Sequence, residues 1–191
     1  MKTKAFKIKK GFTLIETLVA IAIFAFSITG LISITARGVF DTNFVKNKFT
    51  ASYLATEGAE LVRNIRDTAA LGGQNWDVVV ADQDLLNRCY GANNICFIDP
   101  DPQPDYNSPT IPEECTGGVC PALSYRKSEA SFNYDSPDNA DNFRSIFVRT
   151  INIRPIGPKE AMVVSRVEWN QGSELHHVEF SFNLLDWPGP P

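Results

Sequence analysis

A 25-residue apolar run near the start of the chain limits what this sequence can fold into. Between residues 12 and 36 the only ionisable side chain is Glu16. As a helix the run would measure roughly 37 Å, which is enough to cross a bilayer core of about 30 Å. The sequence therefore predicts a membrane-spanning helix over residues 12–36.

The residues before this run form a short basic leader. It contains five lysines and no acidic residue: Lys2, Lys4, Lys7, Lys9 and Lys10. Positive charge beside an apolar segment keeps that end of the chain on the cytoplasmic side of a membrane. In an ordinary secretory signal the small residues of the cleavage site follow the apolar region, whereas Gly11 precedes it here. A cut after Gly11 would remove residues 1–11 and keep the helix. The alternative is a plain membrane anchor in which Gly11 has no role.

The position of Glu16 favours the cut. A carboxylate inside a bilayer costs on the order of 2.5–3.5 kcal/mol on insertion scales, so it requires a partner. Glu16 lies five residues past Gly11, and the new α-amino group of a neighbouring subunit would be a suitable counter-ion. Pairing of this kind would drive subunits to stack through their helices.

The segment from Gly11 to Ala20, GFTLIETLVA, resembles the N-terminal signature of type IV pilins and pseudopilins. The resemblance implies cleavage between Gly11 and Phe12 by prepilin peptidase, N-methylation of Phe12, and packing against other pilin subunits through the helix. It also implies an inner-membrane assembly platform. The expected location is the cytoplasmic (inner) membrane, with a single span in lipid and the head outside, and afterwards an extracellular or periplasmic fibre.

Helical periodicity continues beyond the apolar run. Apolar or small residues at three- and four-residue steps form one stripe: Phe40, Phe44, Ala51, Leu54, Ala55, Gly58, Val62 and Ile65. We therefore expect one long helix whose amphipathic half, residues 37–68, packs on a head formed by residues 69–191. Gly72 and Gly73 mark its end.

The last part of the chain predicts an antiparallel sheet within residues 143–187. Residues 143–154, 161–169 and 174–185 each alternate apolar and polar side chains, and turn residues separate them. One face of such a sheet is apolar, and the amphipathic half of the helix is the element that can cover it. The predicted fold class is α+β, with a long N-terminal helix on a C-terminal antiparallel sheet, as in pilin heads.

Four cysteines lie in the predicted head: Cys89, Cys96, Cys115 and Cys120. Outside the cytoplasm disulfides persist, and the two short spacings favour the local pairs Cys89–Cys96 and Cys115–Cys120 in a stapled loop over residues 89–120. Four cysteines allow three pairings. Zinc is the rival interpretation, but only one of the two spacings matches a zinc knuckle.

Charge and motifs argue against nucleic-acid binding and catalysis. The formal net charge is −4, and removal of the five leader lysines makes the mature chain more acidic, so we expect no direct nucleic-acid binding. His176 and His177 are the only histidines. Adjacent residues of a strand face opposite sides, so these two cannot bind a metal together or act as a catalytic pair. No phosphate loop, nucleophile elbow or dinucleotide motif is present. We expect no enzyme, no metal and no cofactor.

Two acidic clusters are the exception to weigh, because oxygen-rich loops can hold Ca²⁺. Their members are Asp99, Asp101, Asp105, Glu113 and Glu114, and then Asp135, Asp138 and Asp141. Neither has the glycine and glutamate pattern of an EF-hand loop, so a solvated acidic loop is the favoured interpretation.

The resemblance to pilins implies a structural, minor subunit of a type IV pilus or pilus-like fibre. The helix segment from Tyr53 to Glu60, with Arg63 and Arg66, resembles the pilus-modification branch of minor pilins. One alternative is a minor pseudopilin of a type II secretion system. A second alternative is a membrane-anchored extracellular binding domain or enzyme.

Overall fold

The computed structural model describes residues 11, 13–80, 86–100, 111–137 and 140–186. The chain divides into two compact units, Met1–Val45 and Lys46–Pro191, and each unit is described by itself below. The second unit contains the head together with the later part of the long helix.

The predicted long helix is present as α1 (Leu14–Leu71). It ends in a Schellman motif, in which the N–H of Gly73 donates to the carbonyl of Ala70 and the N–H of Gln74 donates to the carbonyl of Ala69. Gly73 has a φ of +77°, a left-handed conformation that glycine adopts without steric cost. The paired glycines therefore stop the helix where the sequence predicts, although α1 extends past residue 68.

In the described part of the head the strands form one seven-stranded sheet, and the strands paired in it are antiparallel. The helix α2 (Trp76–Val80) and two 3₁₀ turns, η1 (Asn87–Cys89) and η2 (Thr116–Gly118), precede or interrupt the strands. The strands are β1 (Cys96–Phe97), β2 (Glu113–Glu114), β3 (Ala122–Arg126), β4 (Ser131–Asn133), β5 (Asn142–Gly157), β6 (Glu160–Gln171) and β7 (Glu174–Leu185).

The three long strands β5, β6 and β7 are those that the alternating pattern predicts. The sequence did not predict β1 to β4, which have two to five residues and are too short to show a period of two. The stapled loop over residues 89–120 therefore begins at the last residue of η1 and contains the two short strands β1 and β2 and the 3₁₀ turn η2.

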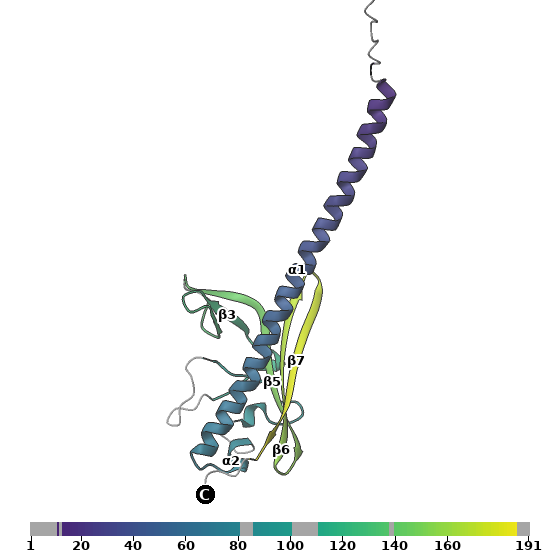
Figure 1. The fold of residues 1–191 in the computed structure, drawn as a ribbon. Helices are drawn as coiled ribbons and strands as arrows, with labels where there is room; N and C mark the ends of the chain where they lie inside the picture. The colour runs from purple at the N-terminus through teal and green to yellow at the C-terminus, as the bar shows by residue number, and fades with distance from the viewer. Residues whose placement is uncertain (1–10, 12, 81–85, 101–110, 138–139, 187–191) are drawn as a thin grey trace, which may run out of the picture. The chain divides into compact units, whose positions relative to one another are not determined.

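Strand β5 is the centre of the sheet (Figure 1). One edge of β5 pairs with β6, which pairs in turn with β7, and its other edge pairs with β3 and with β1 at different positions. The register places Phe147 opposite Trp169 and Trp169 opposite His176. These three side chains therefore share one face of the sheet.

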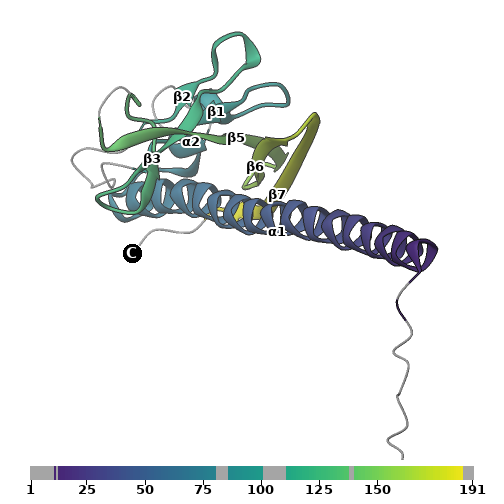
Figure 2. The ribbon, with the colours of Figure 1, turned by 90° about the horizontal axis from the view of Figure 1, so that it is seen from above.

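Within the second unit, α1 lies along that face (Figure 2). Strand β6 alternates strictly, with every odd-numbered residue from Ala161 to Trp169 buried. The predicted helical stripe is buried from Ala51 onward, whereas Phe40 is exposed. The main core cluster joins α1, α2, the first disulfide and the strands, and it includes Val62, Ile65, Val79, Cys89, Cys96, Ile151, Ile153, Val163 and Leu184.

Helix α1 approaches the sheet closely at Gly58. A Cβ atom built on Gly58 would lie 2.5 Å from Oγ of Ser165 and 2.8 Å from Cδ of Arg149. Real Cβ atoms do not come this near to another heavy atom, so a side chain at this position would have to displace the side chains of Ser165 and Arg149 or the helix itself.

We predict that Gly58→Ala destabilises the head by about 1–2 kcal/mol, because overpacking outweighs the higher helix propensity of alanine. Thermal unfolding of the full chain in detergent, followed by tryptophan fluorescence, measures this. Gly38→Ala is the matched control, since it makes the same change in the same helix where nothing lies within 4 Å. Equal or higher stability of Gly58→Ala would show that the contact is not tight.

Candidate functional site

The first turn of α1 is closed by a capping box. Thr13 immediately precedes the helix, and its Oγ1 accepts the N–H of Glu16 at 3.4 Å. In return Oε2 of Glu16 accepts the N–H of Thr13 at 3.5 Å. The pattern Thr-x-x-Glu before an apolar run is the sequence signal for this arrangement. The interpretation of Glu16 as an assembly residue did not include this capping role.

The capping box is compatible with a cut after Gly11. The N–H of Thr13 belongs to the peptide bond between Phe12 and Thr13, so loss of residues 1–11 leaves both capping hydrogen bonds in place. Gly11 is exposed, and nothing lies within 4 Å of a Cβ built there. Phe12 lies outside the described residues. The structure thus places Gly11, Thr13 and Glu16 at the start of one helix, with the Glu16 side chain exposed.

Helix α1 is long and apolar enough to cross a membrane. An 18-residue window of it reaches a mean hydropathy of 2.3, and none of that window is buried. Residues 6–32 match a family model described as the prokaryotic N-terminal methylation motif. The chain carries a prepilin-type signal.

This signal is of the type IV pilin and pseudopilin kind, and it implies processing by prepilin peptidase and assembly with other pilins. The match covers the N-terminal segment and not the head. No curated protein matches the chain, and no solved structure matches it.

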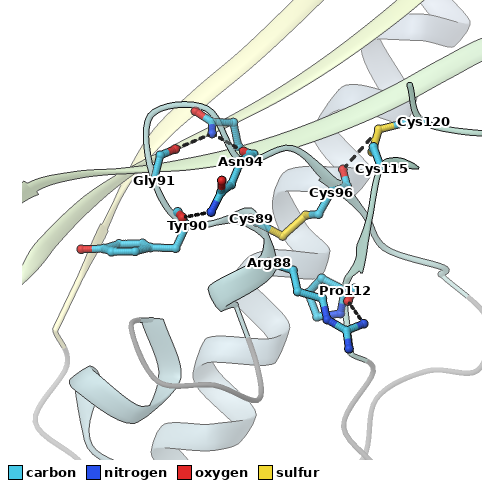
Figure 3. Close-up of a disulfide and its surroundings, with 10 residues drawn as sticks. Arg88, Cys89, Tyr90, Gly91, Asn94, Cys96, Pro112, Cys115 and Cys120 are labelled. Carbon is cyan, nitrogen blue, oxygen red and sulfur yellow. Dashed lines mark hydrogen bonds between the residues drawn. A yellow bond between two sulfur atoms is a disulfide. The ribbon is translucent and has the colours of Figure 1, made fainter. Parts of the chain in front are cut away.

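The four cysteines form the local pairs Cys89–Cys96 and Cys115–Cys120, the pairing that their spacing favours. The first disulfide is part of the core (Figure 3). Around it, Nδ2 of Asn152 donates to the carbonyls of Gly91 and Asn94 at 2.8 and 2.5 Å. These bonds tie the loop between Cys89 and Cys96 to β5.

The second disulfide lies beside the first, where Sγ of Cys120 is 3.9 Å from the carbonyl oxygen of Cys96 (Figure 3). Arg88 donates to the carbonyl of Pro112 at 3.0 Å and so contacts the segment just before this second loop. Cys115 and Cys120 are outside the main core cluster. The two disulfides therefore stabilise different parts of the head.

We predict that loss of the first disulfide costs more stability than loss of the second. Both loops are short, so the entropic contribution of each is similar, on the order of 2–3 kcal/mol. Cys89→Ala with Cys96→Ala also opens the core, which adds about 1 kcal/mol or more. Urea unfolding in a buffer without oxidant or reductant, which keeps the remaining disulfide intact, compares the unfolding free energies of the two double variants. Equal losses would contradict the different placement.

A buried arginine that the sequence did not reveal joins α1 to the sheet. The side chain of Arg149 on β5 is 0% exposed. Its Nη1 donates to Oε2 of Glu57 at 2.6 Å and to the carbonyl of Leu54 at 3.4 Å, and its Nη2 donates to the carbonyl of Ile98 at 2.9 Å. Arg149 lies between Phe147 and Ile151 on the apolar side of the strand's alternating pattern. A charged residue at an otherwise apolar position was the only sequence signal for its burial.

Tyr134 completes the surroundings of Arg149. The guanidinium lies 5.8 Å from the centre of the Tyr134 ring, and the Phe97 ring packs on the Tyr134 ring at 4.7 Å between ring centres. Burial raises the pKa of the Tyr134 phenol above its usual value, and the positive charge of Arg149 opposes this shift. Residues from α1, β5 and the segments after β1 and β4 thus meet at one charged group.

We predict that Glu57→Ala costs about 2 kcal/mol of unfolding free energy, because it leaves the Arg149 charge buried with fewer acceptors. The cost is below that of a fully buried pair, since the Glu57 side chain is 42% exposed and partly screened. Glu60→Ala is the control on the same helix. It breaks the exposed pair with Arg63 and costs less than about 1 kcal/mol.

A second variant tests the charge itself. Adding Arg149→Met to Glu57→Ala removes the buried charge and restores much of the lost stability, because an apolar side chain of similar length needs no acceptor. Chemical unfolding of Glu57→Ala, Arg149→Met and the double variant measures the coupling free energy between the two residues. If the double variant loses as much unfolding free energy as the two single variants together, the two residues are not energetically coupled.

The acidic clusters and the histidines occupy separate places. Asp135 accepts a hydrogen bond from the Arg126 side chain, and Asp141 accepts hydrogen bonds from the hydroxyl and the backbone N–H of Ser128. Asp101, Asp105 and Asp138 lie outside the described residues, as does Trp187. His176 stacks on Trp169 at 5.5 Å between ring centres, and His177 is on the opposite face of β7, exposed. In the described part of the chain no three histidine, cysteine or acidic side chains form a metal-sized group.

Proposed function

We propose that this chain is a structural minor subunit of a type IV pilus or pilus-like fibre. In this proposal prepilin peptidase removes residues 1–11 at the inner membrane, Phe12 is methylated, and the subunit then leaves the lipid and joins the fibre through α1. The observation that carries the proposal is the prepilin-type signal at the start of a long, exposed, apolar helix.

The head supports a structural role. A helix packed on an antiparallel sheet, with two disulfides in the head, suits a subunit that works by assembly. We accordingly propose no catalytic activity, with the head outside the cytoplasm. The minor role rests on the bulk of the disulfide region and on the helix segment from Tyr53 to Glu60.

A minor pseudopilin of a type II secretion system is the alternative, because its helix obeys the same physics. A membrane-anchored binding domain or enzyme is the other. The fibre hypotheses and the anchor hypothesis differ in the role they give to Glu16, whose carboxylate would meet an α-amino group only in an assembled fibre.

The capping box makes a sharp test of this role possible. Glutamine at the third helical position also satisfies a capping box. Glu16→Gln therefore removes the charge and keeps the cap, whereas Thr13→Ala keeps the charge and removes the threonine cap. The two variants separate the electrostatic role from the structural one.

We predict that Glu16→Gln leaves membrane insertion intact and lowers incorporation into fibres about tenfold or more, because the neighbour's amine loses its counter-ion in a medium of low dielectric constant. Thr13→Ala weakens the helix start by about 1 kcal/mol and has a smaller effect on incorporation. The measurement is the amount of subunit in sheared fibres relative to membrane, with the processed N-terminus identified by mass spectrometry.

Gly11→Val is the negative control, since a branched residue at the cleavage position should block processing. A mature chain that starts at Met1 in the unmodified protein would contradict the fibre proposal. Unchanged incorporation of Glu16→Gln would contradict the assembly role of Glu16.

A further inference from the structure

Strand β7 forms a long edge of the sheet. In the described part of the chain it pairs with β6 alone, and its 12 residues include no proline and no lysine. The register between the two strands runs from Gln171 opposite Glu174 to Glu160 opposite Leu185 without a shift. Proteins usually shorten an edge strand, bend it with a bulge, or place proline or lysine in it, because its outward backbone groups can pair with another chain. Strand β7 has none of these features.

The hydrogen-bond pattern shows which backbone groups of β7 point outward. The N–H of Asp186 donates to the carbonyl of Lys159 at 2.9 Å, and hydrogen-bonded pairs alternate along an antiparallel ladder from there. Even-numbered residues of β7 therefore bond to β6, and the N–H and C=O of odd-numbered residues point away from it. The carbonyl of Leu185 agrees with this pattern, because it accepts Nη1 of Arg66 at 2.6 Å. The outward groups from Leu175 to Asn183 meet no other described strand.

The side chains along this edge differ between the two faces of the sheet. Phe180 and Phe182 are on the face that α1 covers, but Phe180 is still 37% exposed and Phe182 is only partly buried. The other face carries polar side chains at His177, Glu179, Ser181 and Asn183. A further strand at this edge would continue both faces, so its residues beside the two phenylalanines would have to be apolar and those between them polar.

The edge also lies next to the helix that the proposed fibre function uses. Within the second unit, β7 runs beside α1 (Figures 1 and 2). The guanidinium of Arg63 lies 4.8 Å from the centre of the Phe182 ring, and Arg66 binds the end of the strand. A subunit that packs on this side of α1 would therefore come close to the outward backbone groups of β7.

We propose that the outer edge of β7 pairs with an extended strand of a neighbouring pilin of a different kind. Outward N–H and C=O groups at strand spacing bind an extended chain, and the alternating side chains determine which chain fits. The segment bound has apolar residues on the α1 face and polar residues on the other. The proposal rests on the fibre function proposed above and adds a contact between heads to the packing of helices.

The geometry excludes a second copy of this chain as the partner. Antiparallel pairing of two β7 edges would point the two α1 helices in opposite directions, and parallel pairing would place them on opposite faces of the joined sheet. Subunits whose helices pack side by side in one direction have to join opposite edges of their sheets. In the described sheet the opposite edges are β2 and β4, which have two and three residues and are too short to pair along β7.

Photo-cross-linking in native fibres tests the contact through its register. A photoactivatable phenylalanine analogue replaces His177, Glu179, Ser181 and Asn183 in turn in the full chain, and mass spectrometry of sheared fibres identifies the linked residues. Strand pairing requires the linked residue to move along one segment of another pilin in step with the position on β7. The same analogue at Arg154, an exposed residue of β5 on the same face of the sheet, should give no such series.

Two variants of Ser181 test the backbone contact itself. Ser181→Pro removes one outward N–H at a position where an edge strand tolerates proline, and Ser181→Ala keeps that N–H. With the analogue at His177, Ser181→Pro should lower the yield of the linked product about tenfold, because a hydrogen bond is lost and the ring obstructs the added strand. Ser181→Ala should change the yield less than about twofold. Thermal unfolding in detergent checks that both heads fold; if the proline variant does not, the cross-link series alone decides.

The possible results separate the two proposals. Absence of the processed chain from fibres would overturn the fibre function and this contact with it. Presence in fibres without an ordered series of links, or with links only to a second copy of this chain, would overturn the contact and leave the function standing. Equal yields for folded Ser181→Pro and Ser181→Ala would also overturn pairing through the backbone.

Discussion

The approach of α1 to the sheet at Gly58 is the contact on which the head depends. Because this residue has no side chain, the helix backbone comes close enough for Leu54 and Glu57 to supply acceptors to Arg149. A fully buried guanidinium without such acceptors would strongly destabilise the fold. The position of the helix on the sheet and the neutralisation of this charge are therefore one constraint, and Ile98 completes it from the stapled loop.

The two disulfides illustrate how one chain divides covalent restraint between stability and surface. The Cys89–Cys96 bond is completely buried and connects the loop to the core between α1 and β5. The Cys115–Cys120 bond lies outside the main core cluster, and the loop that it closes contains Val119, which is 73% exposed. In a small head the first bond stabilises the core, and the second restrains the conformation of an exposed loop.

Glu16 has a structural partner before any assembly takes place. Its carboxylate accepts the N–H of Thr13 in the capping box, which satisfies one donor at the helix start. A charged side chain held by local hydrogen bonds is easier to keep in lipid than one without a partner. The proposed exchange of this local donor for the amine of a neighbouring subunit would then couple helix capping to incorporation.

Local patterns in the sequence determined the long helix, its glycine stop, the three long strands and the local disulfide pairs, because periodicity and turn residues act over a few residues. The short strands β1 to β4, the burial of Arg149 and the close approach at Gly58 came only from the tertiary structure. Each depends on segments far apart in the chain, since strand pairing and the acceptors of a buried charge are supplied by distant residues. The sequence shows a signal for membrane and assembly, and the folded head shows which surfaces remain for partners.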